Sequence, residues 1–412
     1  MDVAFDGTEF VSSTTSYLQR CSRIINAGAH LPRDGVASSL AFARSNPEVI
    51  IMSNRAAWLK RPKAQLEVDD APKAVAGPGE IVIKNVFVAI NPVDWKVQTY
   101  GPSSHHYPSI LGQDIAGEVV EVGSGVTRVR LGDRVIAHGI GRATQIDKYS
   151  AFQLYSVAFE IAVSPIPDSL PYEQAVVLPL AISTAASGLH QKQFLALPYP
   201  TTEPKPSGRT ILIWGGSSSV GSTAIQLAIA SGLEVVTTAS TRNFALVKAL
   251  GAKHVLDYAE EAVVDDIVAL LKGSDFVGGF DAISTSETLN ASADIVHRLG
   301  GGKLAKVLPG EPESGYDDVE LGQGIYEHLS SSLVDVSVLT VQFVTVSASN
   351  IFLKEKIVGE AVWGKYVPAA LASGKLLAKP DPLILSGGLP RVQEALDTLK
   401  AGVSATKVVV EL

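Results

Sequence analysis

The sequence predicts an α/β protein in which a doubly wound parallel sheet is joined to a smaller, β-rich domain. The first observation behind this prediction is a glycine-rich turn at 215–221, which separates a short apolar run from a helical pattern. The second is the strand and helix that follow over 233–250, and the third is a series of short strands between 52 and about 165. The 412 residues suffice for about two or three domains, because single cores stop growing near 300 residues.

Residues 1–51 contain no motif and only weak patterning. We interpret them as an N-terminal extension that is either dispensable or an artefact of start-site choice, and the intact mass of the native protein decides between the two. A transit peptide is a third option, which four arginines favour and three acidic residues near the start disfavour.

Residues 52–180 show short β-branched runs with turn punctuation, at 81–90, at 116–123 and at 126–135, the last with a turn at 131–133. This pattern predicts a small, twisted, barrel-like β domain. A helical region follows from Pro171 to His190.

The glycine-rich turn indicates which kind of ligand binds. Residues 211–214 form an apolar run typical of a strand buried on both faces, and the residues from 218 to 229 place one apolar stripe on a helix that ends at Gly232. Such a turn presents unpaired N–H groups and the positive end of the helix dipole, which suits a pyrophosphate. Against the G-x-G-x-x-G pattern, Gly216 and Gly221 match and Ser218 replaces the second glycine, so a purely structural turn stays an alternative.

The residues after the next strand, 233–238, indicate which cofactor binds. NAD sites usually carry a carboxylate about 20 residues beyond the turn, to bind the ribose 2′-hydroxyl. Here the position holds Ser240-Thr241-Arg242-Asn243, at the start of a helix over 242–250. An arginine at this position, with no carboxylate to repel a phosphate, favours binding of the 2′-phosphate of NADPH. The alternative is that Arg242 is a solvated surface residue without a role in binding.

The rest of the chain completes two further segments. Strands are expected at 254–257, 280–283, 303–308 and 336–346, so that the dinucleotide-binding domain spans 181–345, with 197–207 as a surface excursion. Residues 346–412, with a helix at 361–373 and a strand at 407–410, are expected to return to the β-rich domain and leave a cleft between the two bodies.

Composition excludes several classes of protein. The net charge of −8 disfavours nucleic acid and anionic membranes as partners. Cys21 is the single cysteine, so an intrachain disulfide and a cysteine-built zinc site are ruled out and a reducing, cytoplasmic setting is expected. No apolar run approaches the roughly 18 residues of a membrane span.

Several motifs in the same order resemble those of the medium-chain dehydrogenase/reductase superfamily, over about 52–412. They are Asn91-Pro92-Val93-Asp94-Trp95-Lys96, Pro108 to Val119, Leu131-Gly132-Asp133-Arg134-Val135, the turn from Gly215 to Gly221, and Leu250-Gly251-Ala252 before His254. The resemblance implies a Rossmann domain and a GroES-like catalytic domain. It is closer to the zinc-independent quinone oxidoreductases, and closer still to fungal trans-acting enoyl reductases that serve polyketide synthases.

The zinc-binding members of this superfamily place a cysteine near Asn91–Asp94 and Gly-His-Glu where Gly112-Gln113-Asp114 stands, and this chain has neither ligand. A zinc site built from His105, His106 and Asp114 is conceivable, but adjacent loop histidines are more often ordinary surface residues. We therefore expect no metal.

The resemblance also implies a set of NADPH contacts across the chain. They are Val93, Lys96, Thr184, Gly215, Gly216, Ser217, Ser218, Ser219, Val220, Gly221, Ser240, Arg242, Asn243, Tyr258, Val307, Leu308, Lys407 and Val408.

Without a metal, hydride transfer suits an acceptor that can spread negative charge, such as an enone, an enoyl thioester or a quinone, and a fixed donor must meet the developing oxyanion. We expect the catalytic residues to be Asn91, Asp94 and Lys96, with Lys96 as the donor and Asp94 orienting it. The alternative role of Lys96 is to hold a ribose hydroxyl or a phosphate. Tyr100 and Tyr107 are weaker candidates for the final proton.

Three functions remain open. The first is an NADPH-dependent enoyl, enone or quinone reductase acting on a small molecule, as a monomer or a homodimer. The second is the same chemistry on an acyl chain carried by a polyketide synthase, and the third is a non-catalytic NADPH-binding redox sensor.

Overall fold

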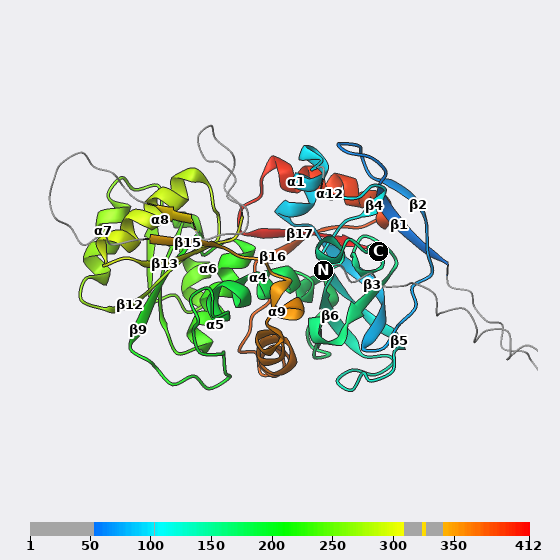
Figure 1. The fold of residues 1–412 in the computed structure, drawn as a ribbon, viewed down its shortest axis with the longest axis horizontal. Helices are drawn as coiled ribbons and strands as arrows, with labels where there is room; N and C mark the ends of the chain where they lie inside the picture. The colour runs from blue at the N-terminus through cyan, green and yellow to red at the C-terminus, as the bar shows by residue number, and fades with distance from the viewer. Residues whose placement is uncertain (1–52, 103, 309–323, 327–340) are drawn as a thin grey trace, which may run out of the picture. The chain divides into compact units, whose positions relative to one another are not determined.

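The computed structural model describes residues 53–102, 104–308, 324–326 and 341–412. The expected extension at 1–51 and the first part of the expected strand at 336–346 lie outside these residues. Met52–Leu412 forms one compact unit, whose course is drawn in Figure 1. Among the helices described, none is long and apolar enough to span a bilayer.

A seven-stranded sheet with the order β11-β10-β9-β12-β13-β15-β14 forms the dinucleotide-binding part. Its neighbours pair in parallel except for β14, which runs antiparallel to β15. The strands are β9 (Arg209–Trp214), β10 (Glu234–Ala239), β11 (His254–Asp257), β12 (Asp275–Asp281), β13 (Gly302–Lys306), β14 (Gly324–Tyr326) and β15 (Val341–Thr345). From β11 to β15 the sheet has the strand order of the Rossmann fold, which confirms the predicted fold class.

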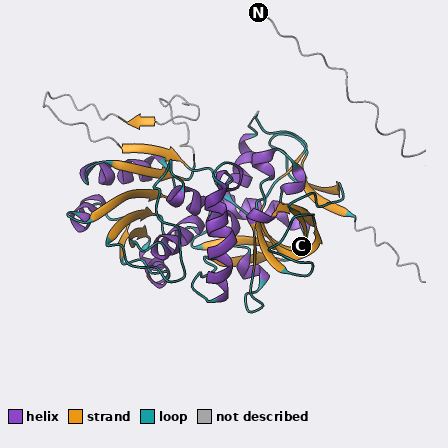
Figure 2. Cartoon of the chain, turned by 60° about the horizontal axis from the view of Figure 1, so that its bottom comes forward, coloured by secondary structure: helices purple, strands orange, loops and turns teal. Residues whose placement is uncertain are grey.

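Helices cover both faces of this sheet, as Figure 2 shows. Ile211 and Ile213 of β9 face a core shared with α4 and α5, whereas Leu212 and Trp214 face a core shared with α7 and α8. This double burial explains why β9 is apolar at successive positions. The helices are α4 (Pro179–His190), α5 (Ser219–Ala230), α6 (Phe244–Ala249, after the 3₁₀ turn η3, Thr241–Asn243), α7 (Val263–Leu271) and α8 (Ser286–Arg298).

The β-rich part contains a second sheet with the order β16-β17-β3-β5-β6-β8, and β7 also pairs with β3. Its strands are β3 (Glu80–Ala89), β5 (Asp114–Val122), β6 (Arg134–His138), β7 (Tyr155–Phe159), β8 (Val163–Pro165), β16 (Asp381–Leu385) and β17 (Thr406–Glu411). A small sheet pairs β1 (Asn54–Leu59) with β2 (Glu67–Ala71) and β4 (Ser109–Ile110). The short helical segments are α1 (Pro92–Tyr100), α2 (Gly141–Thr144), η1 (Asp147–Tyr149), η2 (Glu160–Ala162) and α3 (Tyr172–Ala175).

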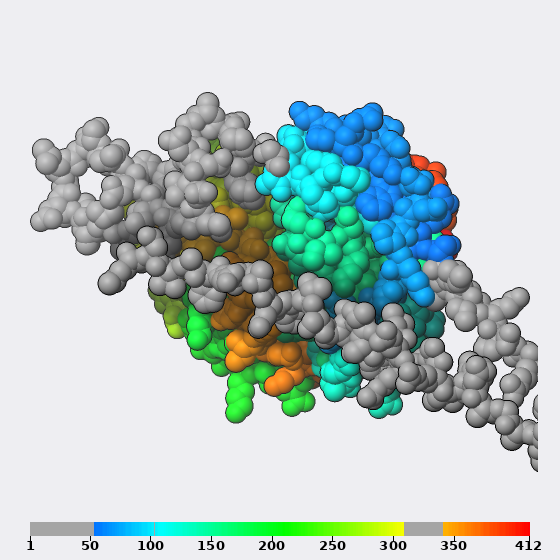
Figure 3. Space-filling view, turned by 45° about the vertical axis from the view of Figure 1, so that its right-hand side comes forward, coloured from blue at the N-terminus to red at the C-terminus, as the bar shows by residue number. Residues whose placement is uncertain are grey.

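The last part of the chain returns to the β-rich sheet, because β17 lies between β16 and β3. Before it come α9 (Asn350–Leu353), α10 (Lys356–Gly359), the π-helix η4 (Glu360–Tyr366) and α11 (Val367–Ala372), and later η5 (Leu389–Arg391) and α12 (Val392–Ala401). Figure 3 shows the surface of the segment after β15, in brown to orange, between the green and the cyan surfaces.

Several element predictions were wrong in detail. The run 126–135 is a strand only from Arg134, because the N–H groups of Thr127 and Arg128 bind the Glu160 carboxylate instead of a neighbouring strand. The helix expected at 361–373 starts as a π-helix. The strand expected at 280–283 runs over 275–281 instead, since Gly278 and Gly279 hide its apolar pattern.

Candidate active site

The glycine turn between β9 and α5 leaves no room for side chains. Gly215 has φ +79°, and a Cβ on Gly216 would lie 2.2 Å from Thr237 Oγ1. A Cβ on Gly221 would lie 2.2 Å from the Gly215 carbonyl oxygen. Glycine is therefore required at these three buried positions, and the turn carries no side chains there that would keep a pyrophosphate away from its backbone.

Ser218, which replaces the second glycine of the pattern, is the N-cap of α5. Its Oγ accepts a hydrogen bond from the Gly221 N–H at 3.0 Å. Ser219 and Val220 occupy the first turn, where N–H groups have no intrahelical partner, and both are half-buried. The serine thus stabilises the helix end and still leaves backbone donors for an anion.

The segment after β10 lies beside this turn. Asn243 Nδ2 donates to Ser217 Oγ at 3.4 Å and to Ser240 Oγ at 3.1 Å. Arg242 is exposed and forms no ion pair within the described part of the chain, and Tyr258, after β11, is 52% exposed. An exposed arginine in the segment that contacts the glycine turn fits a dinucleotide that carries a 2′-phosphate.

The other expected cofactor contacts are placed differently. Val307 and Leu308 are half-buried after β13, and their N–H groups bind Ser284 Oγ at 2.9 and 3.4 Å. Thr184 is buried in α4, where its hydroxyl bonds the Leu180 carbonyl. Val408 is fully buried in the core of the β-rich part.

A buried polar cluster joins four segments of the chain around Asp114. Lys407 Nζ lies 2.8 Å from Asp114 Oδ2, with side chains that are 4% and 0% exposed. Asn91 Nδ2 donates to the same oxygen at 2.7 Å, and the Leu180 N–H donates to Asp114 Oδ1 at 2.6 Å. Lys407 also donates to Asn91 Oδ1, so both ends of the Asn91 amide are bound.

Asp94 lies at the edge of this cluster, in the first turn of α1. Its carboxylate accepts the Asn91 N–H at 2.8 Å. Burial raises the pKa of Asp94 to about 7; the Asn91 N–H lowers it, and the nearby Asp114 carboxylate raises it further. Asp94 is therefore a carboxyl group that exchanges its proton near neutral pH.

The raised pKa of Asp94 predicts a pH dependence of stability. Between about pH 4 and 7 the folded state keeps a proton that the unfolded chain has lost, so the free energy of unfolding should fall as pH rises. The free energy of unfolding of the wild type should fall by at most about 1.4 kcal/mol per pH unit more than that of Asp94→Asn. Urea denaturation of the wild type and of Asp94→Asn at about pH 5, 6 and 7 measures this difference. The prediction is wrong if the free energy of unfolding changes with pH equally in both proteins.

Lys96 lies two residues after Asp94 on α1 and is half-buried, with Nζ 5.6 Å from the centre of the Trp95 ring. Lys400 of α12 approaches the same ring at 6.0 Å. Tyr100 is 58% exposed. Burial raises the pKa of Tyr107, whose hydroxyl is buried and has no hydrogen-bond partner among the described residues.

Sequence reasoning missed a second buried polar group. Trp363 of the π-helix donates to Ser183 Oγ at 3.0 Å, and this oxygen lies 2.9 Å from His138 Nδ1. Burial lowers the pKa of His138 to about 4, so its ring is neutral at neutral pH, with Nε2 facing Gln113 Oε1 at 3.4 Å. No local pattern could have found these residues, because they come from four separate segments.

The two histidines considered for a zinc site are engaged elsewhere. His105 Nε2 lies 2.8 Å from Ser109 Oγ, and His106 Nε2 lies 3.0 Å from Asp147 Oδ1. Asp114 is paired with Lys407. Over 53–102, 104–308 and 341–412, no three His, Cys, Asp or Glu side chains gather as metal ligands.

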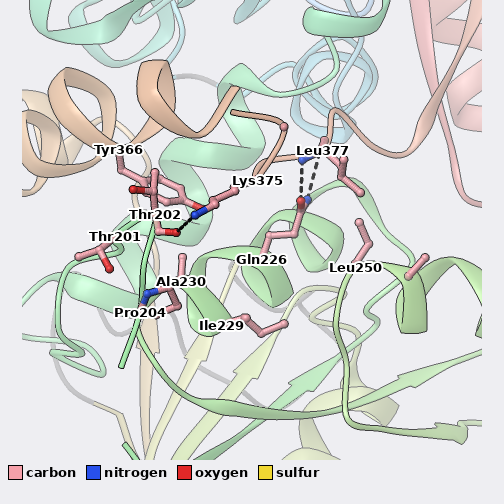
Figure 4. Close-up of a pocket in the computed structure, with 12 residues that line it drawn as sticks. Thr201, Thr202, Pro204, Gln226, Ile229, Ala230, Leu250, Tyr366, Lys375 and Leu377 are labelled. Carbon is pink, nitrogen blue, oxygen red and sulfur yellow. Dashed lines mark hydrogen bonds between the residues drawn. The ribbon is translucent and has the colours of Figure 1, made fainter. Parts of the chain in front are cut away.

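A pocket of about 330 Å³ lies along the C-terminal half of α5, lined among others by Gln226, Ile229, Tyr366 and Lys375 (Figure 4). Lys375 Nζ donates to the Thr202 carbonyl at 2.6 Å, beside this pocket. The glycine turn meets the opposite end of α5, so this pocket is separate from the dinucleotide site.

Two family models match the chain: the alcohol dehydrogenase GroES-like domain over residues 77–162 and the zinc-binding dehydrogenase over residues 219–307. A trans-enoyl reductase of Aspergillus japonicus, himH, is 44% identical over 87% of this chain and 97% of its own. Among solved structures, an alcohol dehydrogenase superfamily protein from Novosphingobium aromaticivorans matches with TM-score 0.67 and 24% identity, over 87% of this chain and 99% of that one. A quinone oxidoreductase of Pseudomonas syringae pv. Tomato DC3000 matches with TM-score 0.63 and 22% identity, over 88% and 100%.

Proposed function

Because the chain belongs to the medium-chain dehydrogenase/reductase superfamily, we propose that it reduces a conjugated carbon–carbon double bond or a quinone, with NADPH and without zinc. The observation that carries the proposal is the bare glycine turn with the exposed Arg242 beside it. The similarity to a trans-enoyl reductase at 44% identity supports the choice of acceptor.

The preference for NADPH rests on charge. The segment after β10 offers Arg242 and no carboxylate, so a 2′-phosphate gains a cationic partner and meets no repulsion there. Asn243, Ser240 and Ser217 lie together beside the arginine as polar partners for the phosphate or the ribose.

We propose a reaction without zinc because the side chains that could act as metal ligands already have other partners. The carboxylate of Asp114 is committed to an ammonium group, a backbone N–H and an amide, and an ammonium at 2.8 Å repels a metal cation. His138 is committed to Ser183 and Gln113.

A nicotinamide bound at this turn would supply a hydride, and the chain would have to stabilise the charge that develops on the substrate oxygen. An ammonium or an N–H aimed at this oxygen is worth roughly 3 kcal/mol of barrier. Lys96 is the proposed donor, because it follows Asn91 and Asp94 on α1, and the buried cluster around Asp114 fixes the start of that helix. Asp94 is proposed to orient this part of the helix through its bond to the Asn91 N–H.

Replacing the ammonium of Lys96 should separate its two candidate roles. If Lys96 is the oxyanion donor, Lys96→Met lowers the single-turnover rate of hydride transfer by about 100-fold and leaves the NADPH Kd within about twofold. Stopped-flow absorbance and fluorescence titration measure the two quantities. Lys400→Met, which removes another ammonium over Trp95, is the control. A weaker NADPH Kd with an unchanged rate would assign Lys96 to cofactor binding.

A second candidate is the same chemistry on an acyl chain carried by a polyketide synthase. The relative named a trans-enoyl reductase favours it. A protein that binds NADPH as a redox sensor, without catalysing a reaction, is the alternative to an enzyme.

A panel of acceptors separates the three functions. NADPH oxidation is followed by stopped flow with free enones, quinones, enoyl thioesters of a small thiol and enoyl chains on a carrier protein. Turnover of free acceptors supports the first function, and turnover of carrier-bound chains alone supports the second. Tight NADPH binding without turnover of any acceptor would contradict both reductase functions and would support the sensor function.

A further inference from the structure

Ser284, three residues after the end of β12, has a backbone conformation that residues with a Cβ rarely adopt. Its φ is +60°, and the residue is only 3% exposed. This left-handed conformation is common for glycine and costs energy for serine, because Cβ crowds the following carbonyl group. Such outliers persist where surrounding contacts enforce them, and they concentrate at functional sites.

The contacts that enforce this conformation use the full hydrogen-bonding capacity of the Ser284 hydroxyl. Ser284 Oγ donates to the Asp281 carbonyl at 3.2 Å and accepts the N–H groups of Val307 at 2.9 Å and Leu308 at 3.4 Å. One donor and two acceptor positions are the full capacity of a hydroxyl group. Ser284 therefore ties the loop after β12 to the segment after β13.

The same loop also contacts the glycine turn. The Asp281 carboxylate accepts the N–H groups of Ile283 at 2.8 Å and Ser284 at 2.9 Å, which fixes the loop backbone. Ile283 packs against Gly215, where a Cβ would meet Ile283 Cγ1 at 2.4 Å. The loop 281–284 thus lies between the glycine turn and residues 307–308.

We propose that Ser284 is a positioning residue for the nicotinamide cofactor, an inference that rests on the proposed function. Its hydroxyl holds Val307 and Leu308 at a fixed place relative to the glycine turn, on the carboxyl edge of the sheet, where such folds bind ligands. The Val307 N–H already donates to Ser284 Oγ, so residues 307–308 would contact the cofactor through their side chains and carbonyl oxygens.

Two substitutions separate positioning from stability. Ser284→Ala removes the hydroxyl and keeps the strained φ, so we expect a Tm lower by about 2 °C and an NADPH Kd raised about five- to tenfold. Ser284→Gly removes the hydroxyl and relieves the strain, so the Tm should return toward wild type while the Kd stays raised. Thermal melts without cofactor and NADPH fluorescence titrations measure the two effects.

Ser292→Ala is the matched control, because Ser292 is a fully buried serine of α8 whose hydroxyl has no hydrogen-bond partner among the described residues. Its Kd should equal that of wild type. The inference is overturned if both Ser284 variants bind NADPH within about twofold of wild type, or if glycine restores the Kd together with the Tm. A wild-type protein that binds neither NADPH nor NADH overturns the proposed function itself, and the inference with it.

Discussion

Asp114→Ala is expected to destabilise the protein by about 3–5 kcal/mol, because it leaves the ammonium of Lys407 buried without a counter-charge. Lys407 is 4% exposed and lies 2.8 Å from the carboxylate that would be removed. The Leu180 N–H and the Asn91 amide would lose their acceptor as well. Urea denaturation followed by tryptophan fluorescence measures the change.

Two further variants test the cause. Asp114→Leu combined with Lys407→Met removes both charges, so it should cost less than Asp114→Ala, since no buried charge is left unpaired. Asp168→Ala breaks an ion pair with Arg134 in which the aspartate side chain is fully exposed, and it should change stability little. If Asp114→Ala behaved like Asp168→Ala, the buried cluster would not hold the segments together as described.

Arg242→Ala should weaken NADPH binding by about 10- to 100-fold, the loss expected when a charged hydrogen-bonding partner of a phosphate is removed. NADH lacks the 2′-phosphate, so its Kd should change less than about twofold. Fluorescence titration with both cofactors measures the difference. Added salt should reduce the wild-type preference for NADPH, because Arg242 is exposed and the interaction is screened.

Lys248→Ala is the control for this prediction, since Lys248 is an exposed cation of α6 that lies over the Phe244 ring. It should leave the affinities for both cofactors unchanged. Equal losses of NADPH and NADH affinity in Arg242→Ala would mean that the 2′-phosphate is recognised elsewhere.

Local patterns were sufficient for the nucleotide end of the site. An apolar run, two glycines and a helical stripe specify β9, the turn and α5, because each depends on neighbours in the chain. The strand of β13 shows the limit of such patterns: it was expected to reach 308 and ends at Lys306, before the two residues whose N–H groups bind Ser284. That contact spans 23 residues and has no sequence signal.

The catalytic end of the site shows the same division. Asn91, Asp94 and Lys96 were proposed from a short motif, and their roles stay predictions. The structure adds that Asn91 is held at both ends of its amide by residues that no motif connects to it.

Adjacent residues are enough to predict the two kinds of domain, the glycine turn and the arginine with no carboxylate near it, because backbone geometry and local charge depend on neighbours in the chain. Which charges are buried together depends on how distant segments pack. Lys407 reaches Asn91 across 316 residues of chain, and Trp363 reaches Ser183 across 180. Burial sets both the pairing and the pKa of such groups, and burial exists only once distant segments have packed.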